Sequence, residues 1–168
     1  MQRVSLHTVT ECRRDALLAL RVRPEQQAFV TGVAAALEEA AAMPECQARA
    51  VVEAAGGQVV GFLMYALDRN ERAPWIYRVL IDAAAQGRGL GRAALEAAAA
   101  EMATAWPLHP RVFLGVRPDN AGAVAFYHRC GFRPAGRVIG GEQVLWRSLR
   151  REAATDTDAD TDGAAGGA

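Results

Sequence analysis

The chain has 168 residues, of which 51% are apolar and 23% charged, and its 19 basic and 19 acidic residues cancel. This composition is typical of one globular domain with a full core, and a neutral chain gives no indication of a nucleic-acid or membrane partner. No apolar run is long enough to span a membrane, and Met1–Ser5 lacks the apolar core of a signal peptide. Cys12, Cys46 and Cys130 lie too far apart for a zinc site or disulfide framework. We therefore expect a cytoplasmic protein without a metal.

The first third of the chain predicts one strand and two helices. Residues 3–9 alternate as in a strand, and residues 11–22 form a helical pattern with Thr10 as its N-cap. A second helix is predicted to begin at Pro24 and to end at Pro44. Its apolar stripe consists of Phe29, Val33, Leu37 and Ala40.

The rest of the chain predicts six more strands and two helices. Residues 48–54 and 58–67 form two strands around the hairpin signal Gly56-Gly57, and residues 75–81 form the next strand. Helices are expected over residues 90–105 and from Asn120 to about Cys130, with Gly131 as a C-cap glycine. The remaining strands lie at residues 111–116, from 132 to the Gly140-Gly141 break, and from 144 to 149.

This order predicts a mixed α/β domain, at residues 1–150, around one central sheet of about seven strands. Residues 151–168 contain mainly Thr, Asp, Ala and Gly, and we expect them to form a disordered tail.

The segment Gln86-Gly87-Arg88-Gly89-Leu90-Gly91-Arg92 lies between a predicted strand and a predicted helix. Alternate glycines leave backbone N–H groups uncovered at a helix N-terminus, which favours a phosphate ligand. The segment lacks the Gly-Lys-Ser/Thr of a P-loop, and its third glycine comes one residue too early for a dinucleotide loop. The sequence therefore predicts an anion site and leaves its ligand open.

A second segment runs from Asn120 to Phe132, with Asn120, Ala123 and Tyr127 on one helical face. The two segments together resemble the GNAT superfamily of acyl-CoA-dependent N-acetyltransferases, which carry a Q/R-x-x-G-x-G/A loop and an N-x-x-A-x-x-x-Y-x-x-x-G-F helix. Gln86, Gly89 and Gly91 match the first motif. The second motif is matched at every position, by Asn120, Ala123, Tyr127, Gly131 and Phe132.

The resemblance implies a GNAT-like sheet, splayed between strands 4 and 5 with helices on both faces, that binds acetyl-CoA. It assigns the general acid to Tyr127, which would protonate the departing CoA thiolate. The cofactor contacts that it implies are Leu80, Ile81, Gln86, Gly87, Arg88, Gly89, Leu90, Gly91, Arg92, Asn120 and Tyr127. Asn120 has a second reading as a helix cap. Dimers are common in the superfamily, so a homodimer is an expectation from the resemblance.

The segments 20–30, 60–65 and 75–82 are further similar to diamine (spermidine/spermine) N-acetyltransferases. This likeness implies a small primary amine, such as a polyamine, as the acceptor. An enzyme that acetylates a protein N-terminus, a lysine or an antibiotic amine is one alternative, and a module that binds acyl-CoA without catalysis is another. A cationic acceptor favours acidic neighbours. The candidate substrate residues are Glu38, Glu39, Tyr65 and Tyr77. The candidate bases are Glu38, Glu39, Asp68, Glu71 and, through water, Tyr77.

Overall fold

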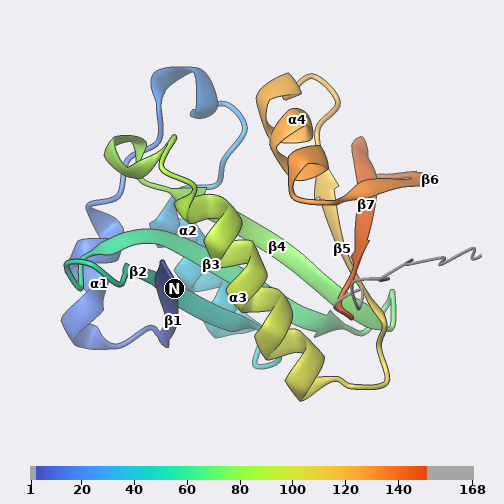
Figure 1. Ribbon diagram of the computed structural model, residues 1–168, viewed down its shortest axis with the longest axis horizontal. Coiled ribbons are helices and arrows are strands. Elements are labelled where there is room, and N and C mark those ends of the chain that lie inside the picture. Colours follow the sequence, from blue (N-terminus) through green and yellow to red (C-terminus); the bar gives the residue numbers. More distant parts are fainter. Residues whose placement is uncertain (1–2, 151–168) are drawn as a thin grey trace, which may run out of the picture.

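The computed structural model describes residues 3–150, which form a seven-stranded sheet with helices on both faces (Figure 1). The predicted tail at residues 151–168 lies outside the described residues. In chain order the elements are β1 (Val4–Thr8), α1 (Glu11–Leu18), a 3₁₀ turn (Pro24–Gln26), α2 (Val33–Ala42), β2 (Gln47–Glu53), β3 (Val59–Asp68), β4 (Ala73–Ile81), a second 3₁₀ turn (Ala83–Ala85), α3 (Leu90–Ala105), β5 (Arg111–Val116), α4 (Ala121–Arg129), β6 (Arg133–Ile139) and β7 (Glu142–Ser148).

The sheet has the strand order β1-β2-β3-β4-β5-β7-β6. Neighbouring strands are antiparallel except for β4 and β5, which are parallel. A parallel pair requires a crossover, and α3 supplies it. The glycine-rich segment therefore lies at the carboxyl end of β4, where α3 begins.

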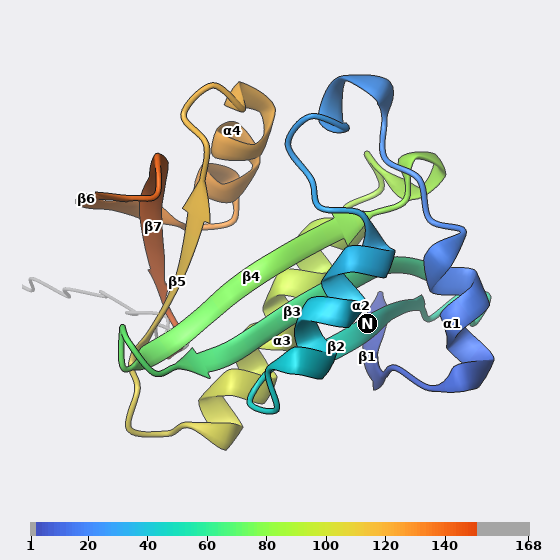
Figure 2. The same cartoon turned by 180° about the vertical axis from the view of Figure 1, so that it is seen from behind.

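The strands β4 and β5 are paired at one end and then diverge. Trp75 lies opposite Phe113 and Ile76 lies opposite Leu114, whereas β4 continues to Ile81 without a further partner in β5 (Figure 2). This confirms the predicted splay between strands 4 and 5. The divergence leaves one edge of β4 open in the middle of the sheet.

A β-bulge lies where the two strands part. In the pairing of β3 with β4, Tyr65 is opposite Ile76 and Met64 is opposite Arg78, so Tyr77 is an extra residue in β4. A bulge bends its strand and re-aims side chains. Here it directs Tyr77 and Arg78 toward the α2 side of the sheet, where Tyr77 packs against that core and Arg78 contacts α2.

Two apolar clusters cover the two faces of the sheet. The helix α3 packs across one face, and α1 with α2 cover the other (Figures 1 and 2). Among residues 3–150, no helix combines the length and the apolar character needed to cross a membrane. The central members of the α3 cluster are Leu63, Leu95, Ala98, Met102, Leu114 and Leu145, and those of the α1–α2 cluster are Leu17, Ala36, Leu37, Phe62 and Met64.

The helix predicted over residues 11–22 ends earlier, at Leu18. The reason is tertiary: the Arg21 amide donates to Asp82 Oδ2 at 2.9 Å, and the Arg21 carbonyl accepts from the Ala83 amide at 2.7 Å. A residue whose backbone is bonded to a distant loop cannot continue a helix. The same residue's guanidinium donates to the Leu18 carbonyl at the helix end.

The second predicted helix is also shorter than expected. The segment from Pro24 forms a single 3₁₀ turn, and α2 begins only at Val33, after Gly32. Glycine is a weak helix former, and the intervening Phe29 contacts another part of the fold, with its ring 5.2 Å from the Arg117 guanidinium. The prediction that Phe29 belongs to a helical stripe is therefore wrong.

The other elements lie close to their predicted ranges, and Leu90–Ala105 and Arg111–Val116 match them. Gly131 has a φ angle of +85°, as expected of a C-cap glycine. Thr10 occupies the N-cap position of α1, but its side chain makes no capping hydrogen bond.

Candidate active site

A glycine-rich loop joins β4 to the first turn of α3. Gly87 and Gly89 have φ angles of +79° and +77°, a left-handed conformation that favours glycine. Within residues 3–150, the backbone N–H groups of residues 87–92 have no hydrogen-bond acceptor, and pairing resumes at Ala93, which donates to the Gly89 carbonyl at 3.1 Å. A row of unpaired N–H groups at a helix N-terminus attracts phosphate. The loop therefore has the features of a phosphate-binding site.

The side chain of Gln86 holds this loop in place. Its amide donates to the Ile81 carbonyl at 2.9 Å and to Gln26 Oε1 at 2.8 Å. These bonds join the loop to the end of β4 and to the first 3₁₀ turn. Because both bonds are internal, we assign Gln86 a positioning role and leave the ligand contacts to the backbone of the residues that follow.

The two arginines of the loop differ in their surroundings. The Arg88 guanidinium forms an ion pair with Glu53 at the end of β2, and the Arg88 carbonyl accepts from Arg3 Nη1 at 3.0 Å. Arg92 is exposed on the first turn of α3 and forms no ion pair with any residue from 3 to 150. Arg92 is thus the side chain that is already free to meet a phosphate, whereas Arg88 would first have to leave Glu53.

The open edge of β4 leads from the bulge to the glycine loop. Leu80 and Ile81, the two residues predicted to contact the cofactor, are paired with Phe62 and Gly61 of β3 on their other edge. Toward β5 they have no strand partner, because the pairing of β4 with β5 ends at Ile76. An unpaired strand edge can bind an extended, amide-containing chain as an additional strand.

The helix α4 follows β5 and carries Tyr127. Its N-cap is Asn120, whose Oδ1 accepts from the Ala123 amide at 3.2 Å. Of the two roles considered for Asn120, helix cap and cofactor contact, this hydrogen bond is the one expected of a helix cap. Figure 1 shows α4 beside β5.

Tyr127 lies half-buried between two aromatic rings. The ring centroids of Phe126 and Phe132 are 5.3 and 5.7 Å from that of Tyr127. Burial, with smaller contributions from nearby Cys130 and Glu142, raises the pKa of the Tyr127 hydroxyl above its ordinary value. Within residues 3–150 this hydroxyl makes no hydrogen bond, so it is not a core tyrosine tied to the backbone. It is a protonated hydroxyl available to a ligand.

The acidic residues predicted on α2 have different neighbours. Glu39 pairs with Arg78 of β4 at 2.8 Å, whereas Glu38 is exposed and forms no ion pair with a described residue. Arg78 Nε is buried without a hydrogen-bond partner among residues 3–150. The helix therefore directs one carboxylate toward the bulged part of β4 and the other toward solvent.

Asp68, Glu71 and Tyr77 come together beside the opening. Tyr77 donates its hydroxyl hydrogen to Asp68 Oδ2 at 2.6 Å, and the Glu71 amide donates to Asp68 Oδ1 at 2.7 Å. Burial alone would raise the pKa of Asp68, but these two hydrogen bonds, together with one from the Asn70 backbone, prevail and lower it. Burial and the adjacent Asp68 raise the pKa of Tyr77.

Tyr65 is separated from these groups by the sheet itself. Its side chain packs in the α3 cluster, and its hydroxyl donates to Glu101 of α3, which also pairs with Arg49 at 3.0 Å. The structure thus brings Tyr77 and Glu39 to the α2 side and places Tyr65 on the opposite face.

The sequence gives no indication that the carboxylate of Glu142 lies near the opening. This residue begins β7, and a Cβ placed on Gly115 of β5 would lie 3.2 Å from the Glu142 Cβ. The Glu142 side chain therefore covers the bare backbone of β5 near the opening. Its approach depends on the register of β5 with β7, for which the sequence carries no local signal.

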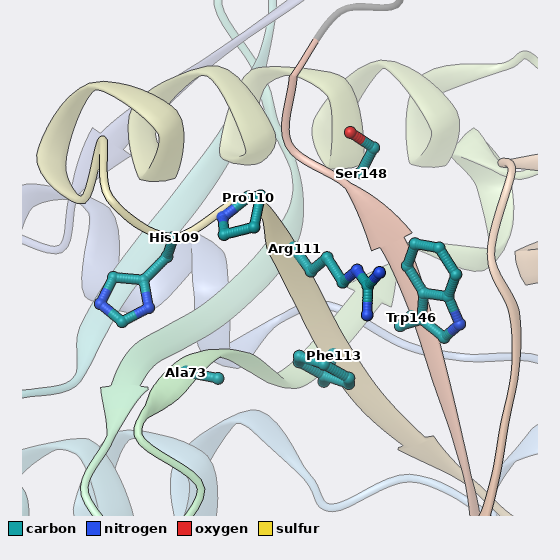
Figure 3. Close-up of a pocket in the computed structure, with 7 residues that line it drawn as sticks. All are labelled: Ala73, His109, Pro110, Arg111, Phe113, Trp146 and Ser148. Atoms are coloured by element: carbon teal, nitrogen blue, oxygen red, sulfur yellow. The ribbon is translucent and has the colours of Figure 1, made fainter.

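Two hollows lie outside this region. One, of about 430 Å³, is lined by residues of β5 and β7, by the segment before β5 and by Ala73 at the start of β4, and it contains no residue of the glycine loop or α4 (Figure 3). The other, of about 640 Å³, lies between β2, β3 and the end of α3 and includes Tyr65. The candidate active site is instead the opening between β4 and β5, bounded by the glycine loop and α4.

The parallel pair that splays apart, the glycine loop and α4 together can be compared with known protein families. Residues 14–132 match the model of the Acetyltransferase (GNAT) family. The chain belongs to that family: it is an N-acetyltransferase that uses acetyl-CoA, as the two sequence motifs predict.

Particular relatives extend the match to nearly the whole domain. The chain is 30% identical over 154 residues to the spermine/spermidine N(1)-acetyltransferase of Bacillus subtilis (strain 168), covering 87% of this chain and 99% of that protein. An acetyltransferase structure from Thermus thermophilus has a TM-score of 0.65 at 28% identity, over 87% and 97% of the two chains. The spermidine N-acetyltransferase of Vibrio cholerae in complex with CoA and spermine has a TM-score of 0.65 over 89% and 97%. Its identity of 16% shows the fold alone.

Proposed function

We propose that the chain transfers the acetyl group of acetyl-CoA to a primary amine of a small molecule, and that this acceptor is a polyamine such as spermidine or spermine. The name of the B. subtilis relative, which matches across nearly the whole domain, supports the choice of acceptor. The observation that carries the reaction is the opening between β4 and β5, which has unpaired backbone N–H groups at one side and Tyr127 at the other.

In the proposed complex, residues 87–92 donate backbone hydrogen bonds to the diphosphate of CoA, and the positive end of the α3 dipole faces it. Leu80 and Ile81 pair with the amide-rich arm of CoA along the open edge of β4. The thioester then lies near the bulge. The loop at Gly87, where a Cβ would have no atom within 4 Å, supports this placement, and at Gly89 the nearest group is the Arg3 guanidinium, whose positive charge also favours a phosphate.

The reaction is the attack of a neutral amine on the thioester carbonyl. The C–N bond forms, the C–S bond breaks, and the electron pair of that bond leaves with the sulfur. We propose that the Tyr127 hydroxyl protonates this thiolate. A tyrosine with an ordinary pKa of about 10 is already protonated at neutral pH, which is the state that a general acid requires, and the raised pKa of Tyr127 extends that state to higher pH.

The amine must lose two protons in all, one before attack and one after it. An alkylammonium pKa of about 10.4 leaves about one amine in a few thousand neutral at pH 7, so a route for the first proton accelerates the reaction. We propose that water beside the hydrogen-bonded pair of Tyr77 and Asp68 carries this proton to solvent, because the lowered pKa of Asp68 lets its carboxylate orient the water as a charged hydrogen-bond acceptor without taking the proton itself. Glu39 and Glu71 are less suited, because each is paired with an arginine.

A panel of amines tests the proposed function. The protein is incubated with acetyl-CoA and, separately, spermidine, spermine, putrescine, an aminoglycoside and a lysine-containing peptide. Released CoA and acetylated product are measured by mass spectrometry. We expect the polyamines to give the highest kcat/KM. Preferential acetylation of the aminoglycoside or the peptide would contradict the proposed acceptor, and CoA binding without acetylation of any amine would contradict the proposed reaction.

A further inference from the structure

An irregularity in β6 points the side chain of Arg137 across the sheet. Arg133 and Pro134 pair with β7, and the pairing resumes at Val138 after a register shift. Gly136, between them, has a φ angle of +75°, which only glycine adopts easily. Bulges next to active sites commonly re-aim a side chain.

The Arg137 guanidinium lies in a cluster formed by three other parts of the chain. Its Nη2 is 2.6 Å from the carboxylate of Glu71, in the loop between β3 and β4. Its central carbon is 5.9 Å from the ring of Trp75 in β4 and 5.7 Å from the ring of Phe113 in β5. These two rings are stacked, with centroids 5.8 Å apart and planes at 16°. A carboxylate beside aromatic faces is an environment that binds cations.

This cluster adjoins the opening described above. Trp75 and Phe113 are the pair next to the last pair of β4 and β5, so the opening begins about two residues, or about 6 to 7 Å, further along the strand. Asp68 connects the two regions, because it accepts from the Glu71 amide and from the Tyr77 hydroxyl. A second ammonium of a short polyamine would therefore be within reach of the cluster while the first occupied the opening.

Arg137 is held much more weakly than a structural arginine of the same chain. The guanidinium of Arg147 is 10% exposed, pairs with both carboxylate oxygens of Glu96 and donates to the Cys130 carbonyl. In contrast, the Arg137 side chain is 41% exposed and has one ion-pair partner among residues 3–150. An exposed ion pair contributes little to stability, so Arg137 is held mainly by its contacts with the Trp75 and Phe113 rings, which the ammonium of a ligand can replace.

The cluster is also open to solvent on one side. Phe113 lines the hollow of about 430 Å³ shown in Figure 3, together with Arg111 and Trp146. The exposed part of the Phe113 ring thus faces free space that a ligand can enter.

We propose that Glu71, Trp75 and Phe113 form a second cation site, which binds the distal ammonium of a polyamine acceptor and which Arg137 fills in its absence. Arg137 is then an internal competitor that weakens the binding of di- and polyamines. This proposal rests on the proposed function for its ligand. A monoamine has no second ammonium to exchange with Arg137 and gains nothing from the site.

The variant Arg137→Ala tests this directly, with Arg133→Ala as its control. Arg133 is an exposed residue of the same strand, so its loss changes the net charge equally. We expect Arg137→Ala to lower the ratio of KM for spermidine to KM for butylamine roughly tenfold, as expected for releasing a cation–π contact and an exposed ion pair. Arg133→Ala should keep the wild-type ratio. An unchanged or higher ratio in Arg137→Ala would overturn the proposal.

A binding measurement without acetyl-CoA separates the two proposals. Spermidine is titrated into Arg137→Ala and into Arg137→Ala/Trp75→Phe while tryptophan fluorescence is recorded. A saturable change that is lost with Trp75 supports the cation site, even if no amine is acetylated. No change in Arg137→Ala, in a protein that does acetylate spermidine, would overturn the cation site and leave the proposed function standing.

Discussion

The ring of Phe126 in α4 lies against the α-carbon of Gly91 in the first turn of α3. A Cβ on Gly91 would be 3.1 Å from Phe126 Cζ and 3.4 Å from Ile81 Cγ1. The two segments that carry the family motifs are therefore in direct contact, one residue away from Tyr127. The absence of a side chain at position 91 allows the helix carrying the proposed acid to approach the proposed phosphate loop.

Gly91→Ala should move α4 away from the loop. We expect the free energy of unfolding to fall by about 1 to 2 kcal/mol from overpacking, and kcat to fall with it, because Tyr127 moves with Phe126. Gly122→Ala is the control: it lies in α4 with no atom within 4 Å of the added Cβ, so it should gain up to about 1 kcal/mol of helix stability. Chemical denaturation measures both. Equal stabilisation by Gly91→Ala and Gly122→Ala would show that Phe126 leaves room for a side chain at position 91.

Gly89→Glu should abolish CoA binding, because a carboxylate in the loop repels phosphate. Gly89→Ala is the matched control for backbone strain, since both variants place a Cβ at a φ of +77°, at a cost of about 1 to 2 kcal/mol of stability. We expect calorimetry to detect CoA binding by the alanine variant and none by the glutamate variant. A Gly89→Glu variant that binds CoA with wild-type affinity would contradict the proposal that the loop binds the CoA phosphates.

The pH dependence of kcat should show no decrease from deprotonation of the Tyr127 hydroxyl up to about pH 10. The neutral form of a tyrosine is the protonated one, so a raised pKa extends its acidic form to higher pH. With saturating acetyl-CoA and amine, we expect kcat to stay level or rise between pH 7 and 10. A descending limb with a midpoint below pH 10, absent in Tyr127→Phe, would contradict the environment described for this hydroxyl.

Cys46 should react slowly with alkylating reagents despite being only partly buried. Burial, followed by the charges of Glu45 and Glu39, raises the pKa of its thiol from 9.0 to about 11, which lowers the thiolate fraction about a hundredfold near pH 8. We expect peptide mapping after brief treatment with iodoacetamide to show labelling of the exposed Cys12 well before Cys46. Equal labelling rates would contradict this electrostatic environment.

The sequence predicts well those features that depend on local signals. Asn120 marks the beginning of α4 and Gly131 its end, as their ordinary capping preferences predict. Gly56-Gly57 marks the hairpin between β2 and β3. The glycine segment could be proposed as an anion site because its spacing and its place before a helix are both local properties.

The features that the sequence does not predict depend on distant residues. The end of α1 is set by bonds from Arg21 to the loop after β4, and the bulge at Tyr77 is hidden in a strand with no break in its pattern. The partners of the acidic residues follow from register and from the irregularity at Gly136. Carboxylates that appear free in the sequence, such as Glu39 and Glu71, are therefore paired with arginines in the fold.

The variant Tyr127→Phe tests the proposed chemistry most directly. The hydroxyl makes no hydrogen bond within residues 3–150, so its removal should leave the melting temperature and the affinity for CoA close to those of the wild type. Loss of a general acid typically slows the chemical step about 10²- to 10⁴-fold. We therefore predict that single-turnover release of CoA with spermidine falls by at least about a hundredfold while CoA binding by calorimetry is unchanged. A Tyr127→Phe enzyme that releases CoA at the wild-type rate would contradict the assignment of Tyr127 as the acid.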